Sequence, residues 1–286
     1  MIFSGEERSM EGILLATHGG ESAEGAARVA AQLAERLRAQ LGVLCVLEPQ
    51  PVVDYGYLAA VPPTPEQYQM LSEALRGAVT SQLRRCGKVE CAPVVEIGLG
   101  AQEIARAARE QGAALIVVGL GPHHVLDRAL GGETALQLVQ IASTPVLALP
   151  ANATSIPRRV MAAVDFTPTS IRAARVPLLW LGPGDVLELV HVAPPDAPSA
   201  VSRLEQLKTE MVSETRATIE TRELRGDPAR TLLEHAATSR SDLIAAGTHG
   251  YGIWKRLTLG SVASKLVRLS PVGVLIAPLG AVTQPR

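Results

Sequence analysis

The sequence predicts an α/β protein made of two similar domains, each with a parallel β-sheet flanked by helices. Short apolar segments alternate with Ala- and Leu-rich helical segments along the chain, which is the pattern of βαβ units. Of the 286 residues, 47% are hydrophobic but only 3% are aromatic. The core is therefore expected to consist of Ala, Val, Leu and Ile, as in sheets that helices cover. The third observation is an internal repeat.

The repeat runs without an insertion through the last part of each half. At a constant offset of 128 residues the two halves match, and the residue pairs are Gly98 and Gly226, Gly119 and Gly247, Arg128 and Arg256, Gly132 and Gly260, and Pro150 and Pro278. The offset is larger at the first strand, because the segment Pro49–Pro65 lengthens the first half. We expect two copies of one domain, at residues 1–150 and 151–286.

The first half is expected to hold five strands and four helices. The strands are predicted from short apolar runs at Gly12–Thr17, Val43–Leu47, Pro93–Ile97, Ala114–Gly119 and Val146–Leu149. The helices between them are predicted at Ser22–Leu41, Pro65–Arg85, Ala101–Gln111 and Glu133–Ala142. The proline-rich segment Pro49–Pro65 has no clear period, and we expect a loop or a lid there.

The pattern starts again after Pro150–Arg158, a polar segment that we interpret as a linker. The second set of strands is predicted at Val160–Val164, Val186–Val192, Ile219–Leu224, Leu243–Gly247 and Val274–Ala277. The helices are predicted at Ser170–Leu181, from about Ser199, at Ala229–Thr238 and at Ser261–Leu269. Glycines at Gly182 and Gly184 are expected to end the first of these helices.

Charge and hydropathy argue against two classes of partner. The formal net charge is −1 with both signs spread along the chain, so no broad basic surface for nucleic acid is predicted. No apolar run approaches the ~20 residues that span a bilayer, and the first residues carry acids where a signal peptide carries basic residues. Cys45, Cys86 and Cys91 fit a reducing compartment and lack partners for a zinc set. We expect a cytoplasmic protein without a metal site or a membrane contact.

The stretch Gly247–Ser264 is the strongest candidate for a binding site. It follows the apolar run Leu243–Ala246, is rich in glycine, and leads into a helical pattern. Glycines let the backbone approach an anion, and the free N–H groups of a first helical turn point at it. In a doubly wound sheet, this loop and Asp165, after the first strand of its half, are expected to meet. Lys255 and Arg256 in the loop could neutralise phosphate. The alternative is that the glycines only make a turn and Asp165 only caps a helix.

Three familiar motifs do not fit this loop. The sequence has no Gly-x4-Gly-Lys-Ser/Thr phosphate loop and no Gly-x-Ser-x-Gly nucleophile turn. Gly247, Gly250 and Gly252 reverse the spacing of the dinucleotide fingerprint. The spacing that fits is Gly-x2-Gly-x9-Gly-Ser, which Gly247, Gly250, Gly260 and Ser261 match at every position.

With this spacing, the strand end Val164-Asp165 and the turn Gly226–Ala229, the chain resembles the universal stress protein family in its tandem form. The resemblance implies two Rossmann-like domains of the adenine nucleotide alpha hydrolase-like kind, each a five-stranded parallel sheet of order 3-2-1-4-5 flanked by helices. It also implies that ATP binds, with or without Mg²⁺. The site residues that it implies are Ala163, Val164, Asp165, Val192, Ala246, Gly247, His249, Gly250, Gly260, Ser261 and Val262. No catalytic residue is implied.

Members of this family dimerise, often through their fifth strands. The resemblance therefore implies that the two halves form such a pair within one chain, and it leaves a further homodimer open.

The first half departs from the motif at three positions. His18 stands where Asp165 stands, Pro122 replaces the second glycine, and Glu133 replaces Ser261. Proline lacks an N–H donor, and a carboxylate at the helix start competes with phosphate for the same N–H groups. We predict that the first half does not bind ATP and serves as a partner or sensor. His18, His123 and His124 follow its first and fourth strands, so either they form a metal or acidic-ligand site or they are surface and capping residues.

Three functions remain open from the sequence. The first is an ATP-binding regulatory protein of the stress response, with one competent site per chain and little or no turnover. The second is a slow ATPase or phosphotransferase, for which only Asp165 and His249 offer a general base. The third is an interaction module that binds no nucleotide.

Overall fold

The computed structural model describes residues 12–49, 63–87, 91–120, 132–248 and 260–278. Ten strands in these ranges form one sheet of order β3-β2-β1-β4-β5-β10-β9-β6-β7-β8. The first half contributes β1 (Ile13–Ala16), β2 (Leu41–Leu47), β3 (Val94–Ile97), β4 (Leu115–Leu120) and β5 (Val146–Pro150). The second contributes β6 (Arg159–Ala163), β7 (Val186–Ala193), β8 (Thr218–Arg225), β9 (Leu243–Gly247) and β10 (Gly273–Ala277).

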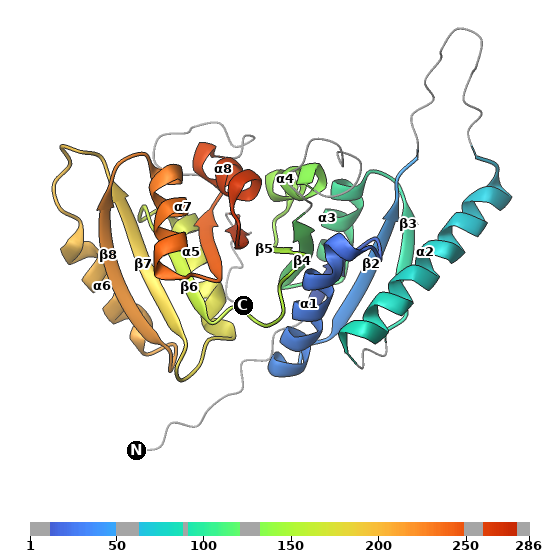
Figure 1. Ribbon diagram of the computed structural model, residues 1–286, viewed down its shortest axis with the longest axis horizontal. Coiled ribbons are helices and arrows are strands. Elements are labelled where there is room, and N and C mark those ends of the chain that lie inside the picture. Colours follow the sequence, from blue (N-terminus) through green and yellow to red (C-terminus); the bar gives the residue numbers. More distant parts are fainter. Residues whose placement is uncertain (1–11, 50–62, 88–90, 121–131, 249–259, 279–286) are drawn as a thin grey trace, which may run out of the picture.

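Each half has the strand order 3-2-1-4-5, as predicted, and all neighbouring strands within a half are parallel. The two halves meet at their fifth strands. β5 and β10 pair antiparallel, with Leu147 opposite Leu275. The sheet therefore continues through the middle of the molecule (Figure 1).

Helices cover both faces of this sheet. One face is covered by α1 (Glu24–Leu37) and α2 (Pro65–Cys86) in the first half, and by α5 (Pro168–Arg175) and α6 (Val201–Val212) in the second. The other face is covered by α3 (Gly100–Glu110), α4 (Gly132–Ile141), α7 (Pro228–Ser239) and α8 (Ser261–Leu269). Short 3₁₀ turns at Glu21–Ala23 and Val176–Leu179 adjoin α1 and α5. Buried Ala, Val, Leu and Ile side chains fill both interfaces, as the composition predicts.

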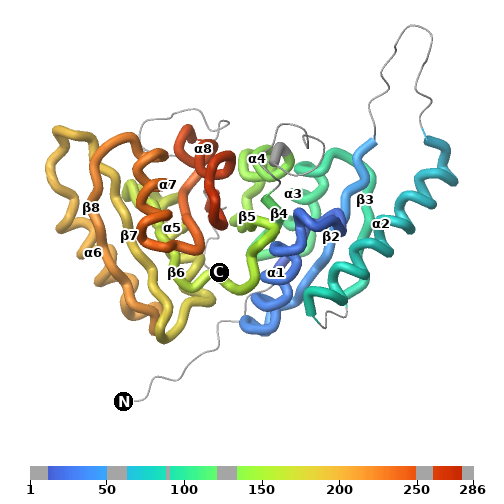
Figure 2. Tube along the Cα trace, viewed as in Figure 1, coloured from blue at the N-terminus to red at the C-terminus, as the bar shows by residue number. Residues whose placement is uncertain are grey.

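The two halves also meet through helices. α4 and α8 lie side by side above the junction of β5 and β10, as Figure 2 shows along the backbone trace. Each of these helices starts at the carboxyl end of the fourth strand of its own half. None of the helices that the structure describes is long and apolar enough to cross a membrane.

Two predicted helices end earlier than expected. The helix predicted at Ser22–Leu41 ends at Leu37, because Arg38 takes a left-handed conformation with φ 51° and the chain turns into β2. The helix predicted at Ser170–Leu181 stops at Arg175 and continues as a 3₁₀ turn that contains Pro177. Proline cannot donate the backbone hydrogen bond that would continue the helix. Most other boundaries lie within two residues of those predicted.

Candidate functional site

A cavity of about 260 Å³ opens in the second half at the carboxyl ends of β6, β7 and β9. The strand order reverses there, since β6 lies between β7 and β9. Nine of the eleven residues predicted to bind nucleotide line this cavity: Ala163, Val164, Asp165, Val192, Ala246, Gly247, Gly260, Ser261 and Val262. The other two, His249 and Gly250, lie outside the described residues, as do Lys255 and Arg256. Residues far apart in sequence are thus brought to one place.

Asp165 follows β6 and organises the turn into α5. Its Oδ1 accepts hydrogen bonds from the Thr167 N–H (3.0 Å) and from the Thr167 hydroxyl (2.5 Å). Thr167, not Asp165, is the residue whose side chain caps α5. Oδ2 of Asp165 accepts no hydrogen bond from the described residues. One carboxylate oxygen therefore holds the turn, and the other is available to a hydroxyl donor in the cavity.

The N-terminus of α8 forms another part of the wall. Gly260 is its N-cap residue, no side chain in the described ranges caps the helix, and its first turn holds no acidic residue. By contrast, Thr167 caps α5 and Asp227 caps α7. The first N–H groups of a helix have no partner within the helix, and they carry partial positive charge. This end of α8 can therefore receive an anion, with the exposed Ser261 hydroxyl beside it.

Gly247 has a packing role that the sequence interpretation missed. A Cβ atom at this position would lie 2.6 Å from Thr169 Oγ1 and 2.7 Å from the Ser170 backbone nitrogen. Gly119, its counterpart in the first half, would bring a Cβ within 3.0 Å of the Ser22 carbonyl oxygen. In both halves this glycine lets the fourth strand approach the segment that follows the first strand. Its presence in both halves therefore does not depend on phosphate binding.

His191 also lines the cavity, and sequence reasoning did not single it out. Its Nδ1 donates a hydrogen bond to the Val164 carbonyl at 2.7 Å, which leaves Nε2 of the neutral ring as an acceptor. The ring lies 5.1 Å from the Phe166 ring, and the Arg203 guanidinium lies 3.9 Å from the centre of that ring. The only sign of His191 in the sequence was its place as a titratable residue within the mostly apolar segment Val186–Val192.

The first half has a pocket at the corresponding place, with a volume of about 80 Å³. His18, the counterpart of Asp165, lies in its wall, and burial lowers the pKa of this imidazole. Pro122, His123, His124 and the side chain of Glu133 lie outside the described parts of the chain, so a cluster of His18 with His123 and His124 stays a prediction. The residues that the structure describes contain no group of three His, Cys, Asp or Glu side chains that could hold a metal ion.

Two stretches of the chain, residues 10–150 and 157–278, match the model of the universal stress protein family. The chain belongs to the universal stress protein family. The full chain is similar to a universal stress protein from Archaeoglobus fulgidus DSM 4304. The two share 18% identity and a TM-score of 0.70, over 96% of this chain and 98% of that one. The tandem arrangement of two α/β domains is therefore common to both.

Two shorter likenesses accompany this match. The stress response protein NhaX of Bacillus subtilis is 42% identical over 53 residues, which are 18% of this chain and 32% of that protein's length. A universal stress protein family protein from Arabidopsis thaliana, solved with AMP bound, is 19% identical over 45% of this chain and 97% of that one, with a TM-score of 0.36. The bound AMP is a property of the Arabidopsis protein.

Proposed function

We propose that this universal stress protein is an ATP-binding regulatory protein with one competent nucleotide site, in its second half. The observation that carries the proposal is the contrast between the two pockets. They occupy the same place in each half, but the volumes are about 260 Å³ and about 80 Å³. Only the larger one combines a carboxylate after the first strand with an uncapped, acid-free helix start.

The chemistry of the larger cavity suits a nucleotide. Phosphates would accept hydrogen bonds from the N–H groups at the start of α8 and from the Ser261 hydroxyl, since anions are stabilised at helix N-termini. The ribose hydroxyls would donate to Asp165 Oδ2. The adenine would lie against the small apolar side chains Ala163, Val192 and Ala246. Mg²⁺, where it accompanies ATP, would be held chiefly through the phosphates.

The ligand that copurifies with the full chain tests this proposal. Mass spectrometry of the denatured protein is expected to release ATP or ADP, at no more than one molecule per chain. Protein that carries no nucleotide and whose melting temperature does not change in millimolar ATP would favour the interaction module instead. If the protein released phosphate from ATP and Asp165→Ala abolished this release, the slow ATPase would be favoured.

We also propose that the boundary between the domains lies near residue 150 and that the halves act as a pair within one chain. The antiparallel pairing of β5 with β10 supports this, because these are the fifth strands of the two repeats.

A further inference from the structure

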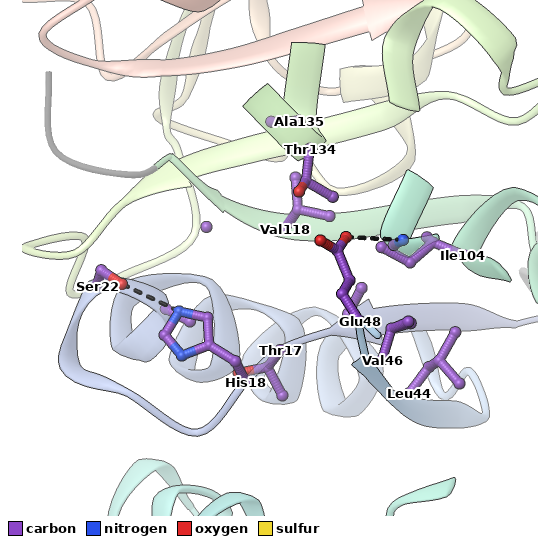
Figure 3. Close-up of a pocket in the computed structure, with 14 residues that line it drawn as sticks. Thr17, His18, Ser22, Leu44, Val46, Glu48, Ile104, Val118, Thr134 and Ala135 are labelled. Carbon is purple, nitrogen blue, oxygen red and sulfur yellow. Dashed lines mark hydrogen bonds between the residues drawn. The ribbon is translucent and has the colours of Figure 1, made fainter. Parts of the chain in front are cut away.

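The small pocket of the first half is formed by the ends of β1, β2 and β4 and by the first turns of α3 and α4 (Figure 3). Its volume of about 80 Å³ is less than a third of the 260 Å³ of the second-half cavity. Leu44, Val46, Ile104 and Val118 give it apolar walls. The pocket is therefore suited to a ligand much smaller than a nucleotide.

Glu48 supplies the charge of this pocket. It follows β2, and its Oε1 accepts a hydrogen bond from the Gly100 N–H at the start of α3, at 2.8 Å. Oε2 accepts no hydrogen bond from the described residues. In Figure 3 the carboxylate points toward the Thr134 side of the pocket. A carboxylate oxygen without a donor, in a partly buried site, favours a ligand that brings one.

The pairing of Glu48 with Gly100 occurs in the first half alone. The strand registers pair Ile13 with Leu41 and Val160 with Leu187, so Glu48 corresponds to Pro194. At the offset of the repeat, Gly100 corresponds to Pro228. Two prolines thus replace a carboxylate and the N–H group that it accepts from. The first-half pocket has an anionic group of its own.

His18 and Ser22 lie on the other side of the pocket. His18 Nδ1 accepts a hydrogen bond from the Gly20 N–H at 3.1 Å, so the proton of the neutral ring is on Nε2. Nε2 then donates to Ser22 Oγ, also at 3.1 Å. Burial lowers the pKa of His18 and so favours this neutral form. In this tautomer His18 cannot take a proton from Ser22, so the pair is not a nucleophile and its base. The Ser22 hydroxyl keeps its own hydrogen to donate.

Glu48 is the one formally charged side chain among the described residues that line the pocket. A cationic ligand would neutralise it. A phosphate would lack the Gly100 N–H at the start of α3, because Glu48 Oε1 already accepts from it. We propose that this pocket binds a small organic cation, with an ammonium or amidinium group that donates to Glu48 Oε2. A hydroxyl or carbonyl oxygen at the other end of the ligand accepts from Ser22. Charge-assisted hydrogen bonds of this kind are about twice as strong as neutral ones.

Nuclear magnetic resonance of the ¹⁵N-labelled full chain tests this proposal, with ethanolamine as the probe. Ethylene glycol is the neutral control, because it replaces the ammonium group with a hydroxyl of similar size. Ethanolamine is expected to shift the Gly100 amide resonance in a saturable way, and ethylene glycol is not. The titration is repeated with saturating ATP. Whether ATP itself binds in the second half is then seen separately from whether ethanolamine binds in the first half.

Glu48→Gln keeps the size of the side chain and an acceptor for the Gly100 amide, and it is expected to weaken ethanolamine binding at least about tenfold. Ser22→Ala, which leaves Glu48 intact, is expected to weaken ethanolamine binding less than Glu48→Gln does. Glu73→Gln, on the exposed face of α2, is the matched control and should leave it unchanged. The proposal is overturned by any of three results: no saturable shift with ethanolamine, an equal shift with ethylene glycol, or unchanged affinity in both pocket variants.

Discussion

At the scale of single residues, the two pockets differ by a few side chains in equivalent places. Asp165 leaves one carboxylate oxygen to a ligand, whereas His18 is neutral and bound to Gly20 and Ser22. Glu48 corresponds to Pro194, as the strand registers show. We expect these exchanges to change the ligand that each pocket accepts, from a nucleotide with its phosphates at a helix start to a small cation at Glu48.

Ser261→Glu would place a carboxylate in the first turn of α8, where the phosphates are proposed to bind. We expect ATP binding to weaken by roughly 1–3 kcal/mol, because hydrogen bonds to a charged group are lost and a like charge is added. Isothermal titration calorimetry measures the change. Thr134→Val, at the corresponding turn of α4, is the control and should leave ATP affinity as it is. If Ser261→Glu bound ATP as tightly as the wild type does, the phosphates would lie elsewhere.

His18 is expected to make stability depend on pH. Burial lowers its pKa in the folded chain, so the unfolded chain binds the proton more readily. The contribution of His18 to the free energy of unfolding is therefore fully present above the unfolded pKa of about 6.5. It is lost as the pH falls below that value. His18→Asn keeps an acceptor for the Gly20 amide but does not titrate. The urea midpoint of the wild type should fall more between pH 7 and pH 5 than that of the variant. If the urea midpoint fell equally in the wild type and in the variant, His18 would have no such role.

At the scale of elements, the glycine at the end of the fourth strand fixes how the sheet meets the neighbouring helix. Gly247→Ala would bring a Cβ atom into contact with the α5 backbone, so we expect a loss of about 1–3 kcal/mol of stability. Gly77→Ala is the matched control, because no atom of the described residues lies within 4 Å of a Cβ there. In the middle of α2 it should stabilise by about 0.5–1 kcal/mol. Denaturant unfolding compares the two, and a Gly247→Ala variant of wild-type stability would refute the packing role.

Most elements of this fold were predictable, because apolar runs and helical periods mark them in the sequence. Helix ends such as Leu37 and Arg175 were less so, since they depend on a left-handed Arg38 and on Pro177 within a helical pattern. The glycine and serine positions of the second-half pocket could be found from their spacing. Glu48 could not, because a single polar residue after a strand carries no spacing. His191 was marked only by its place among apolar residues, and both residues become part of a pocket only once the strands are paired.

At the scale of the whole molecule, one sheet joins the two halves. β10 is buried along its length and pairs with β5 through three residue pairs. A fragment of residues 151–286 would expose this apolar edge, which is a template for pairing with another chain. We expect the fragment to form dimers in size-exclusion chromatography with light scattering. A fragment that stays monomeric at all concentrations would show that the pairing of β5 with β10 is not needed to cover this edge.

We propose that the full chain has one competent nucleotide site, in its second half. Isothermal titration of nucleotide-free protein with ATP tests it most directly, in the wild type and in Ser261→Glu. We expect one ATP per chain in the wild type and greatly weakened binding in the variant. Two ATP molecules per chain, or one that Ser261→Glu leaves untouched, would contradict it.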